Sequence, residues 1–209
     1  VKLFFMIRIS IIALFILSAT TLKSQNSYIP KVLNMRERAA VIDEWLEERV
    51  ETVLPNLMRR AGIDMWVIIS REYNEDPVLK TFLPSTWQSA RRTTILVIID
   101  NGEDKPLETL AMARYGVGKV FKKAWDKEQQ PDQWKALADL IEERNPKVIG
   151  INKSENFALS DGIVATHQEK LLQTLPTKFQ NRLMSAEKLA IGWLETRTPS
   201  EMLLNQNIV

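Results

Sequence analysis

Two stretches of the sequence, Met65-Trp-Val-Ile-Ile69 and Thr93-Thr-Ile-Leu-Val-Ile-Ile99, are apolar almost without interruption. A strand with one face in water alternates apolar and polar residues, whereas a strand covered on both faces is apolar along its whole length. The two stretches therefore predict central strands of a sheet that has helices packed on both of its faces. Asn101-Gly102 follows the second stretch and predicts a turn.

The patterns around these strands predict an α/β fold. Shorter apolar or alternating runs indicate two more strands, and helical spacings or caps indicate three more helices. Their predicted ranges are 107–114, 131–144, 147–151, 160–175 and 186–194. The resulting order of elements is that of an α/β sandwich, with a mixed central sheet flanked by helices. Tryptophans that fall on inward positions are interpreted as core residues: Trp45, Trp66, Trp134 and Trp193.

The region before the first strand, residues 35–61, predicts a long amphipathic helix. Seven apolar residues share the spacing of one buried stripe: Ile42, Trp45, Leu46, Val50, Val53, Leu54 and Leu57. The other side carries glutamates and arginines: Glu44, Glu47, Glu48, Glu51, Arg36, Arg38 and Arg49. We interpret this side as a solvated, ion-paired face rather than as paired catalytic carboxylates. Pro55 is expected to kink or divide the helix, and Gly62 to end it.

A second helix boundary is predicted further along the chain. Ser160-Asp161 is expected to cap the helix of residues 160–175, because short polar side chains accept hydrogen bonds from the first free N–H groups of a helix. Pro176 is expected to end it.

The first 25 residues predict a secretory signal peptide. Lys2 and Arg8 precede an unbroken apolar run, residues 9–17, and small and polar residues follow. The run is too short to span a membrane, which takes about 20 apolar residues. Cleavage is expected at residues 24–25, and no stable membrane span is expected after it.

The charge of the chain is balanced once the signal peptide is set aside. The full chain has 28 Lys and Arg against 26 Asp and Glu, and three of the basic residues lie in the first 25. The remainder gives no case for a nucleic-acid partner or an anionic membrane. The chain has no cysteine, which excludes disulfides and thiolate metal ligands. The signal peptide predicts a secreted or periplasmic protein. Because it has no disulfides, its fold is expected to be stabilised by its hydrophobic core.

Residues 196–202, Thr-Arg-Thr-Pro-Ser-Glu-Met, predict the start of a new helix. Thr198 suits the N-cap, Pro199 suits the first helical position, and Glu201 completes a Thr-x-x-Glu capping box. Only eight residues follow Glu201, and so short a helix is marginal in water without something to pack against. We therefore expect residues 195–209 to be a linker and the truncated first helix of a missing domain.

Together these features resemble the N-terminal domain of the creatinase, prolidase and aminopeptidase P family of pita-bread metallopeptidases. That domain begins with a helix of the Met35-Arg-Glu-Arg38 kind and continues in a strand after a Gly-Ile/Val-Asp step, here Gly62-Ile-Asp64. It ends in a linker of the Lys/Arg-Ser/Thr-Pro-x-Glu-Ile/Met type, here Arg197-Thr-Pro-Ser-Glu-Met202. The resemblance covers residues 33–202 and rests on the order and spacing of these motifs, since none is diagnostic alone.

The resemblance implies that residues 26–194 form a creatinase N-terminal-like domain that does no chemistry and assists oligomerisation and substrate access. The catalytic domain of the family follows the linker and holds two divalent metal ions (Mn, Co or Zn), which polarise a peptide carbonyl and generate hydroxide. No catalytic residue, metal ligand or cofactor is therefore expected in this chain. The implied partners are its own catalytic domain, further copies in a homo-oligomer, and a peptide substrate with proline at the second position.

The chain's own candidate motifs predict no catalytic site. His167, the only histidine, has Asp161 and Glu169 nearby, but a metal site needs three or four converging ligands. We interpret it as a partly exposed helical residue. Gly116-Val-Gly118-Lys119 lacks the upstream glycine and the following Ser or Thr of a phosphate loop, and it predicts a turn between strands. One histidine and no Gly-x-Ser-x-Gly elbow give no basis for a hydrolase triad.

The longest irregular stretch, residues 71–92, holds the candidate site, because long loops in compact domains are often functional. In the family that the chain resembles, N-terminal domains can narrow a neighbouring active site across an oligomer. This implies that Tyr73, Trp87, Arg91 and Arg92 face substrate, since an arginine fork suits a peptide carboxylate. The alternative is an ordinary exposed loop whose arginines pair with nearby acids: Glu72, Glu75 or Asp76.

Two other functions stay open at this point. The chain could be a stand-alone exported module that uses the same fold to bind a peptide or a protein. A nucleotide-binding α/β protein is a further alternative, which the missing phosphate loop and the export signal disfavour. The start residue, Val1 or Met6, is also open.

Overall fold

The structure, a computed structural model, describes residues 32–205. The chain divides into two units, Val1–Asn34 and Met35–Val209. The described residues of the first unit, 32–34, have no regular secondary structure, and every described helix and strand belongs to the second unit. The predicted signal peptide and its cleavage site lie outside the described residues.

Six strands form one mixed sheet in the order β4-β3-β2-β1-β5-β6. Their bounds are β1 Met65–Arg71, β2 Thr93–Ile99, β3 Glu108–Ala111, β4 Lys122–Lys123, β5 Ile149–Ile151 and β6 Leu183–Ser185. β2 pairs antiparallel with both β1 and β3, whereas the pairs β3–β4, β1–β5 and β5–β6 are parallel. The two apolar stretches that predict central strands are therefore the neighbours β1 and β2.

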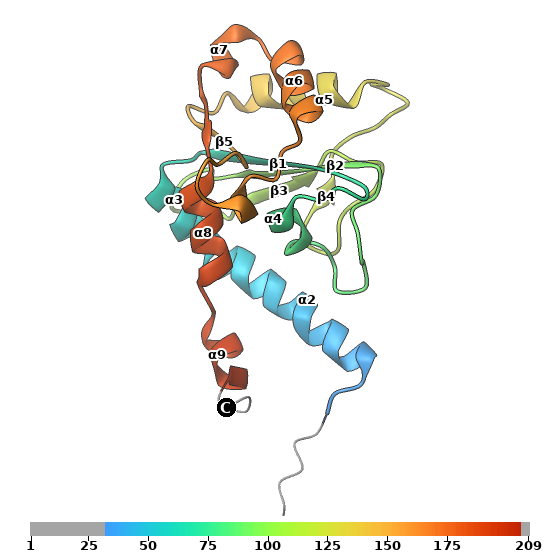
Figure 1. Ribbon diagram of the computed structural model, residues 1–209, viewed down its shortest axis with the longest axis vertical. Helices are drawn as coiled ribbons and strands as arrows, with labels where there is room; N and C mark the ends of the chain where they lie inside the picture. The colour runs from blue at the N-terminus through green and yellow to red at the C-terminus, as the bar shows by residue number, and fades with distance from the viewer. Residues whose placement is uncertain (1–31, 206–209) are drawn as a thin grey trace, which may run out of the picture. The chain divides into compact units, whose positions relative to one another are not determined.

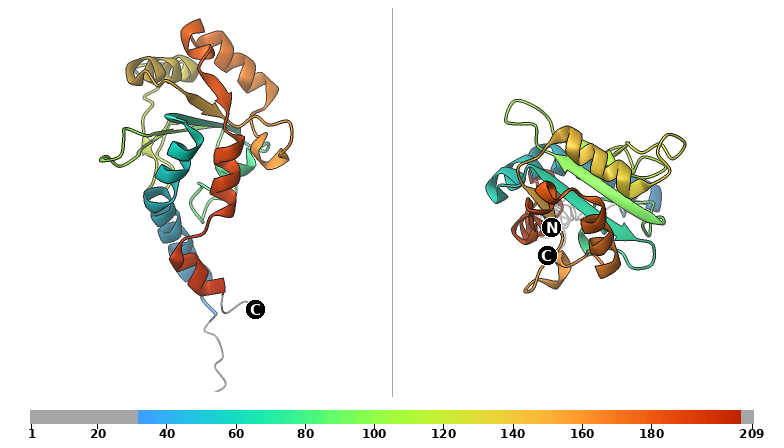
Figure 2. Two further views of the ribbon diagram at one scale, coloured as in Figure 1. Left: turned by 90° about the vertical axis from the view of Figure 1, so that its left-hand side faces the viewer. Right: turned by 90° about the horizontal axis from the view of Figure 1, so that it is seen from above.

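Helices cover both faces of this sheet, which confirms the predicted α/β fold class. Their bounds are α2 Met35–Thr52, α3 Leu54–Ala61, α4 Pro77–Lys80, α5 Gln133–Arg144, the 3-10 turn η1 Ala158–Ser160, α6 Ala165–Thr174, α7 Thr177–Gln180, α8 Glu187–Glu195 and α9 Pro199–Asn205. Figure 1 shows α5, α6 and α7 on one side of the sheet and α3, α4 and α8 on the other. The turned views of Figure 2 show the same layers.

The alternation of side chains along β1 and β2 explains why both strands are apolar throughout. Trp66 and Ile68 join the core beneath α3, α4 and α8, whereas Met65, Val67 and Ile69 join the core beneath α5, α6 and α7. Each of these residues is buried, because successive side chains of a strand point to opposite faces and both faces are covered.

The predicted helix of residues 35–61 is divided at Val53 into α2 and α3, and Pro55 lies in the first turn of α3. Gly62 ends α3 in the left-handed conformation (φ 67°). The Gly62 N–H donates to the carbonyl of Arg59, and the Ile63 N–H donates to that of Met58, so the last turn of the helix is capped. Both predictions are confirmed.

The buried stripe is shorter than predicted. Leu46, Val50, Leu54 and Leu57 are buried, as is Arg49, which the sequence places on the solvated side. Ile42 is 48% exposed, and Trp45 is half-buried. The prediction is wrong for Ile42 and Trp45 because they lie in the first half of α2. That half extends beyond the helices and strands that cover the second half (Figure 1).

Several other boundaries differ from prediction. The helix expected from Ser160-Asp161 begins instead at Ala165, and Val164 occupies its N-cap without a side-chain bond. The Asp161 carboxylate accepts the Ser154 N–H at 3.1 Å and so stabilises the preceding loop. The elements β4, β6 and α7 are not predicted, because segments of two to four residues carry no measurable periodicity.

The interpretation of the tryptophans holds for two of the four. Trp66 and Trp193 are fully buried, whereas Trp45 and Trp134 are half-buried and pack at the margins.

The glycine-containing segment before β4 is a turn, as predicted, with reciprocal backbone bonds between Val117 and Phe121.

Candidate functional site

The segment 71–92 is more ordered than the irregular loop that the sequence predicts. It contains α4, and five of its apolar side chains are core residues: Val78, Leu79, Phe82, Leu83 and Ala90. The Phe82 ring stacks on that of Trp193 at a centroid distance of 4.4 Å. The segment is therefore fastened to the domain by its apolar side chains, whereas polar residues such as Lys80 and Gln88 are exposed.

A buried polar network fastens the start of α4. The Asp76 carboxylate accepts the N–H groups of Val78 (2.7 Å) and Leu79 (3.0 Å), and it also accepts the Asn152 side-chain amide (2.8 Å). The oxygen of that amide accepts the Trp66 indole N–H at 2.8 Å. Burial raises the pKa of the Asp76 carboxyl, and the three hydrogen bonds that it accepts act in the opposite direction. The network holds the start of α4 to β1 and to the residue that follows β5.

The two ends of the segment meet beside the sheet. The N–H of Glu72 donates to the carbonyl of Arg92 at 2.7 Å, and the N–H of Arg92 donates to the Glu72 carboxylate at 3.0 Å. Arg92 has a positive φ of 56°, which is uncommon for a residue other than glycine. The reciprocal bonds hold this conformation.

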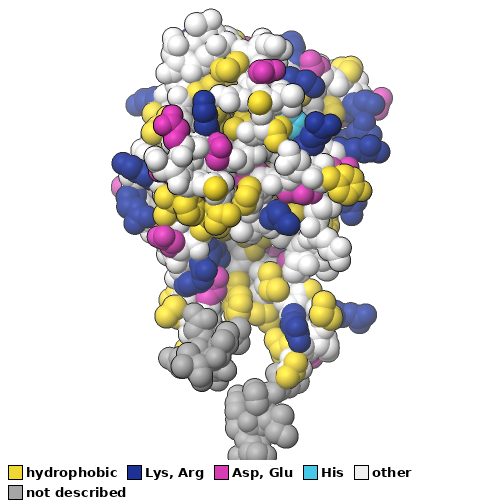
Figure 3. Space-filling model, viewed as in Figure 1, with side chains coloured by type: hydrophobic (Ala, Val, Ile, Leu, Met, Phe, Trp, Pro, Cys, Tyr) yellow, Lys and Arg dark blue, Asp and Glu magenta, His cyan; other side chains and the backbone are white. Residues whose placement is uncertain are grey.

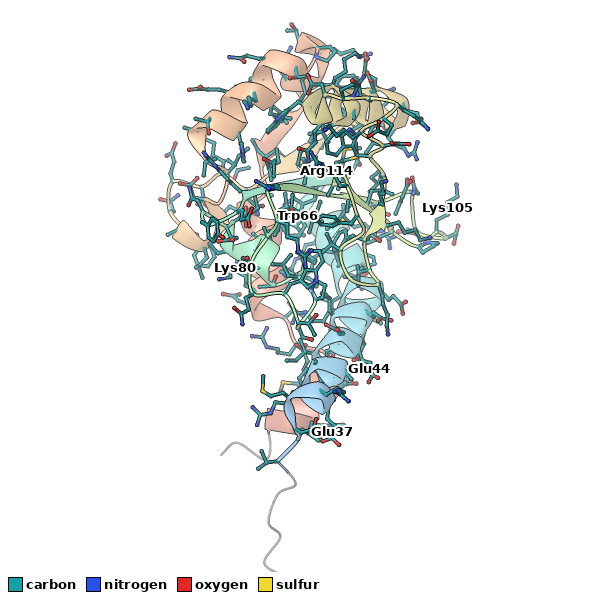
Figure 4. All side chains as sticks on the ribbon, turned by 90° about the vertical axis from the view of Figure 1, so that its right-hand side faces the viewer. Glu37, Glu44, Trp66, Lys80, Lys105 and Arg114 are labelled. Carbon is teal, nitrogen blue, oxygen red and sulfur yellow. The ribbon has the colours of Figure 1, made fainter. Side chains whose placement is uncertain are left out.

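A hollow of about 630 Å³ lies at this junction. Its walls come from both ends of the segment, from the residues after β3 and from the start of α5: Glu72, Ser89, Arg91, Arg92, Thr93, Ala113, Arg114, Tyr115, Trp125 and Gln133. Figure 4 shows Arg114 at the level of the sheet, on the side where α5 covers it.

Arg91 is held in the hollow by aromatic rings. Its guanidinium carbon lies 4.5 Å from the ring centroid of Trp87 and 5.5 Å from that of Tyr115. The two rings meet edge to face at 5.7 Å. Burial raises the pKa of the Tyr115 hydroxyl, and the positive charges of Arg91, Arg114 and Arg92 act against this shift.

The four candidate residues therefore do not form one cluster. Arg91 and Arg92 line the hollow, whereas Trp87 supports Arg91 and is not among the lining residues. Tyr73 sits at the tip of the turn Arg71–Asn74, with φ 66° and 89% exposure, and lies outside the hollow.

Arg114 and Tyr115 are the residues that sequence reasoning missed. They follow β3 and reach the site only because β3 pairs with β2, so no local pattern could identify them. The predicted alternative, in which the arginines pair with neighbouring acids, also differs from the structure. Glu72 binds the backbone of Arg92, and within residues 32–205 no ion pair joins Arg91, Arg92 or Arg114 to a carboxylate.

His167 is buried rather than partly exposed. It packs against the half-buried Trp134 ring, with the centroids 5.4 Å apart, and its Nδ1 has no hydrogen-bond partner among the described residues. Burial lowers the pKa of His167, and the charges of Arg71 and Lys170 lower it further. The helical spacing could not show this, because the covering residues come from α5.

The described part of the chain offers no fit for a metal pair. Its His, Asp and Glu side chains do not gather in groups of three or more that could hold an ion. Asp161 and Glu169, the neighbours of His167 in the sequence, are both exposed. The two divalent ions implied by the family resemblance stay a prediction about a catalytic domain. No helix between residues 32 and 205 has the length and apolar character to cross a membrane.

The predicted capping box is present at the start of α9. The Glu201 carboxylate accepts the Thr198 N–H at 2.7 Å, and the Thr198 hydroxyl oxygen accepts the Glu201 N–H at 3.2 Å. The same carboxylate also accepts a hydrogen bond from the guanidinium of Arg49 on α2. The motif therefore does more than begin a helix, because it also binds the chain back to α2.

Comparison with known proteins gives a single kind of similarity. No protein-family model matches the sequence, and no similar sequence is found among curated proteins. Among solved structures, the chain is similar to the Xaa-Pro dipeptidase from Bacillus anthracis, with a TM-score of 0.45 and 12% sequence identity. The similarity is one of fold. It covers 79% of this chain and 38% of the dipeptidase chain, so this chain corresponds to less than half of the dipeptidase.

Proposed function

We propose that residues 26–194 are the non-catalytic N-terminal domain of an exported metallopeptidase of the creatinase, prolidase and aminopeptidase P type. The observation that carries the proposal is the segment Arg197–Met202. Its residues resemble the family's linker, and its Thr198 and Glu201 form a capping box. In the full-length enzyme, this segment would lead into the catalytic domain and its two divalent metal ions.

The domain would assist oligomerisation and access of substrate. Four apolar side chains are exposed along α2 and α9: Met35, Ile42, Met202 and Leu203. Figure 3 shows hydrophobic side chains around these two helices. A groove of about 270 Å³ beside them is lined in part by Trp45, Leu194 and Arg197. Exposed apolar surface of this kind suits contact with the catalytic domain or with another copy of the chain.

The segment 71–92 would act at the substrate of a neighbouring subunit, a peptide with proline at the second position. Arg91 and Arg92 are the residues best placed for this role, because both line the hollow and neither guanidinium group forms an ion pair with a carboxylate among the described residues. Tyr73 would contact the substrate from its exposed turn, outside the hollow. Trp87 would contribute by holding the guanidinium of Arg91 against its ring.

The test is a peptidase assay on purified residues 26–209 with an Xaa-Pro-Xaa peptide and added Mn²⁺, Co²⁺ or Zn²⁺. A folded protein is expected to give no turnover. A longer chain that continues in frame past Val209 into Asp-, His- and Glu-bearing segments is expected to give metal-dependent cleavage. Metal-dependent turnover by residues 26–209, after removal of contaminating host enzymes, would overturn the proposal.

A stand-alone exported binding module is the second candidate, and the arginine-lined hollow favours it. The gene sequence downstream of Val209 distinguishes the two candidates. A catalytic segment in frame supports the first candidate, whereas a stop codon, together with ligand binding by the isolated chain, supports the second.

A further inference from the structure

The hollow beside β2 and β3 has an excess of positive charge. Arg91, Arg92 and Arg114 line it, and Glu72 is the one acidic residue among its described lining residues. The Glu72 carboxylate accepts the backbone N–H of Arg92, and no carboxylate within residues 32–205 forms an ion pair with any of the three guanidinium groups. Three positive charges that share one hollow repel one another, so an anion that enters it relieves that repulsion.

The Arg91 side chain and the Arg92 backbone are held in place before any ligand arrives. The Arg91 guanidinium lies over the Trp87 ring and near the Tyr115 ring, which restricts its plane. Arg92 keeps a left-handed backbone through its two bonds with Glu72, a strained conformation that persists where surrounding contacts impose it. A side chain that is fixed as that of Arg91 is loses less entropy on binding a ligand.

The remaining wall combines the rings of Tyr115 and Trp125 with polar residues that include Ser89 and Gln133. Trp125 is buried, and its indole N–H donates to the Gln130 carbonyl at 2.7 Å. The Gln133 side-chain amide donates to the backbone carbonyls of Thr93 and Met112. Its N–H groups are therefore already engaged within the protein. The guanidinium groups are thus the charged donors that can meet a ligand, beside the hydroxyls of Ser89 and Tyr115, and the indole of Trp125 and the ring of Tyr115 offer apolar contact.

We propose that this hollow binds a small carboxylate ligand with an apolar body, in which Arg91 and Arg114 donate to the carboxylate and the apolar body lies against Tyr115 and Trp125. The planar fork of a guanidinium matches the two oxygens of a carboxylate. The volume of about 630 Å³ falls in the range of small-ligand sites. The inference does not depend on the proposed function, because this chain supplies every wall of the hollow.

The experiment is isothermal titration of residues 26–209 with three probes: N-acetylphenylalanine, its uncharged amide N-acetylphenylalaninamide, and inorganic phosphate. Saturable binding of the acid, at least about tenfold tighter than that of the amide, supports the proposal, since one charge-assisted contact is worth about that much. Equal binding of acid and amide, or no saturable binding of the acid, overturns it. Tighter binding of phosphate than of the acid overturns the assignment to a carboxylate with an apolar body.

Variants identify the donors. Arg91→Gln and Arg114→Gln are each expected to weaken binding of the acid about tenfold or more. Arg91→Lys keeps the charge and loses the fork, so it is expected to weaken binding as well. Lys105→Gln is the matched control, because it removes the same charge from an exposed loop outside the hollow (Figure 4). Thermal unfolding verifies that each variant is folded, and equal losses in Lys105→Gln and the arginine variants would overturn the assigned donors.

Discussion

Arg49 and Glu201, which lie 152 positions apart in the sequence, form an ion pair with a nearest distance of 3.1 Å between Nη1 and Oε1. Their side chains are only 10% and 14% exposed. Arg49 also donates to the carbonyls of Thr196 (2.8 Å) and Trp193, and its guanidinium carbon lies 4.2 Å from the Trp193 ring centroid. One side chain of α2 thus holds the end of α8, the connection after it and the start of α9.

Arg49→Met is expected to lower the free energy of unfolding by about 2–4 kcal/mol. The substitution removes the cationic partner of the largely buried Glu201 carboxylate, which keeps only the Thr198 N–H, and it removes a donor from the carbonyls of Thr196 and Trp193. Loss of one partner of such an ion pair is costly. Chemical denaturation measures the loss. Hydrogen exchange of residues 196–205 is expected to rise more than that of β1, and unchanged protection there would contradict the role given to Arg49.

Thr198→Ala is expected to cost about 0.5–2 kcal/mol, because the Glu201 N–H loses its N-cap acceptor. Ser200→Ala is the matched control in the same first turn of α9. The Ser200 hydroxyl bonds only the exposed Glu48 carboxylate, at 3.2 Å, and its loss is expected to cost a few tenths of a kcal/mol. Equal costs of the two substitutions, measured by urea unfolding, would argue against the capping box.

Gly162→Ala is expected to destabilise the protein by about 1–3 kcal/mol. A Cβ at this position would lie 2.1 Å from Oδ2 of Asp76, and the hydrogen bonds to Val78, Leu79 and Asn152 prevent that carboxylate from moving away. Gly62→Ala is the comparison, since a Cβ there meets nothing within 4 Å and costs only the left-handed backbone conformation, about 1 kcal/mol. A smaller loss of stability for Gly162→Ala than for Gly62→Ala would contradict the prediction, because it would show that the Asp76 carboxylate can move to make room for the Cβ.

The stability of the protein is expected to fall below pH 6.5 because of His167. Burial lowers the pKa of the folded-state imidazole below its ordinary value of 6.5, so the unfolded chain binds a proton that the folded chain does not. Above pH 6.5 both states are neutral and the contribution is absent. The loss grows as pH falls from 6.5 to the lowered folded pKa.

Because His167 is the only histidine, its titration can be assigned without ambiguity. Proton NMR of the imidazole reports the folded pKa directly. Unfolding of the native protein and of His167→Gln, measured between pH 5 and pH 7.5, is expected to show a steeper loss for the native protein. A folded pKa at or above 6.5, or identical slopes, would refute the prediction.

The parts of the fold that the sequence predicts are those determined by neighbouring residues. β1 and β2 are identified because burial of both faces leaves an apolar run, and the capping box is identified because Thr198 and Glu201 are three positions apart. The end of α3 at Gly62 is equally local. These patterns are complete within a few residues of the sequence.

The parts that sequence reasoning missed depend on distant residues. Arg49 follows the pattern of a solvated face, and its burial results from the packing of α8 and α9 against α2. His167 is buried through contact with Trp134 on α5. The hollow needs Arg114 and Tyr115, which β3 brings beside Arg91 only once the sheet has formed.

The two outer strands of the sheet are both very short. β4 consists of the exposed residues Lys122 and Lys123, and β6 has only three residues, Leu183–Ser185. An outer strand can template aggregation when it offers a long row of free amides, and short, lysine-rich strands suppress this. Copies of the chain therefore have little means of joining their sheets into one continuous ribbon, and we expect the domain to resist amyloid-like association even at high concentration.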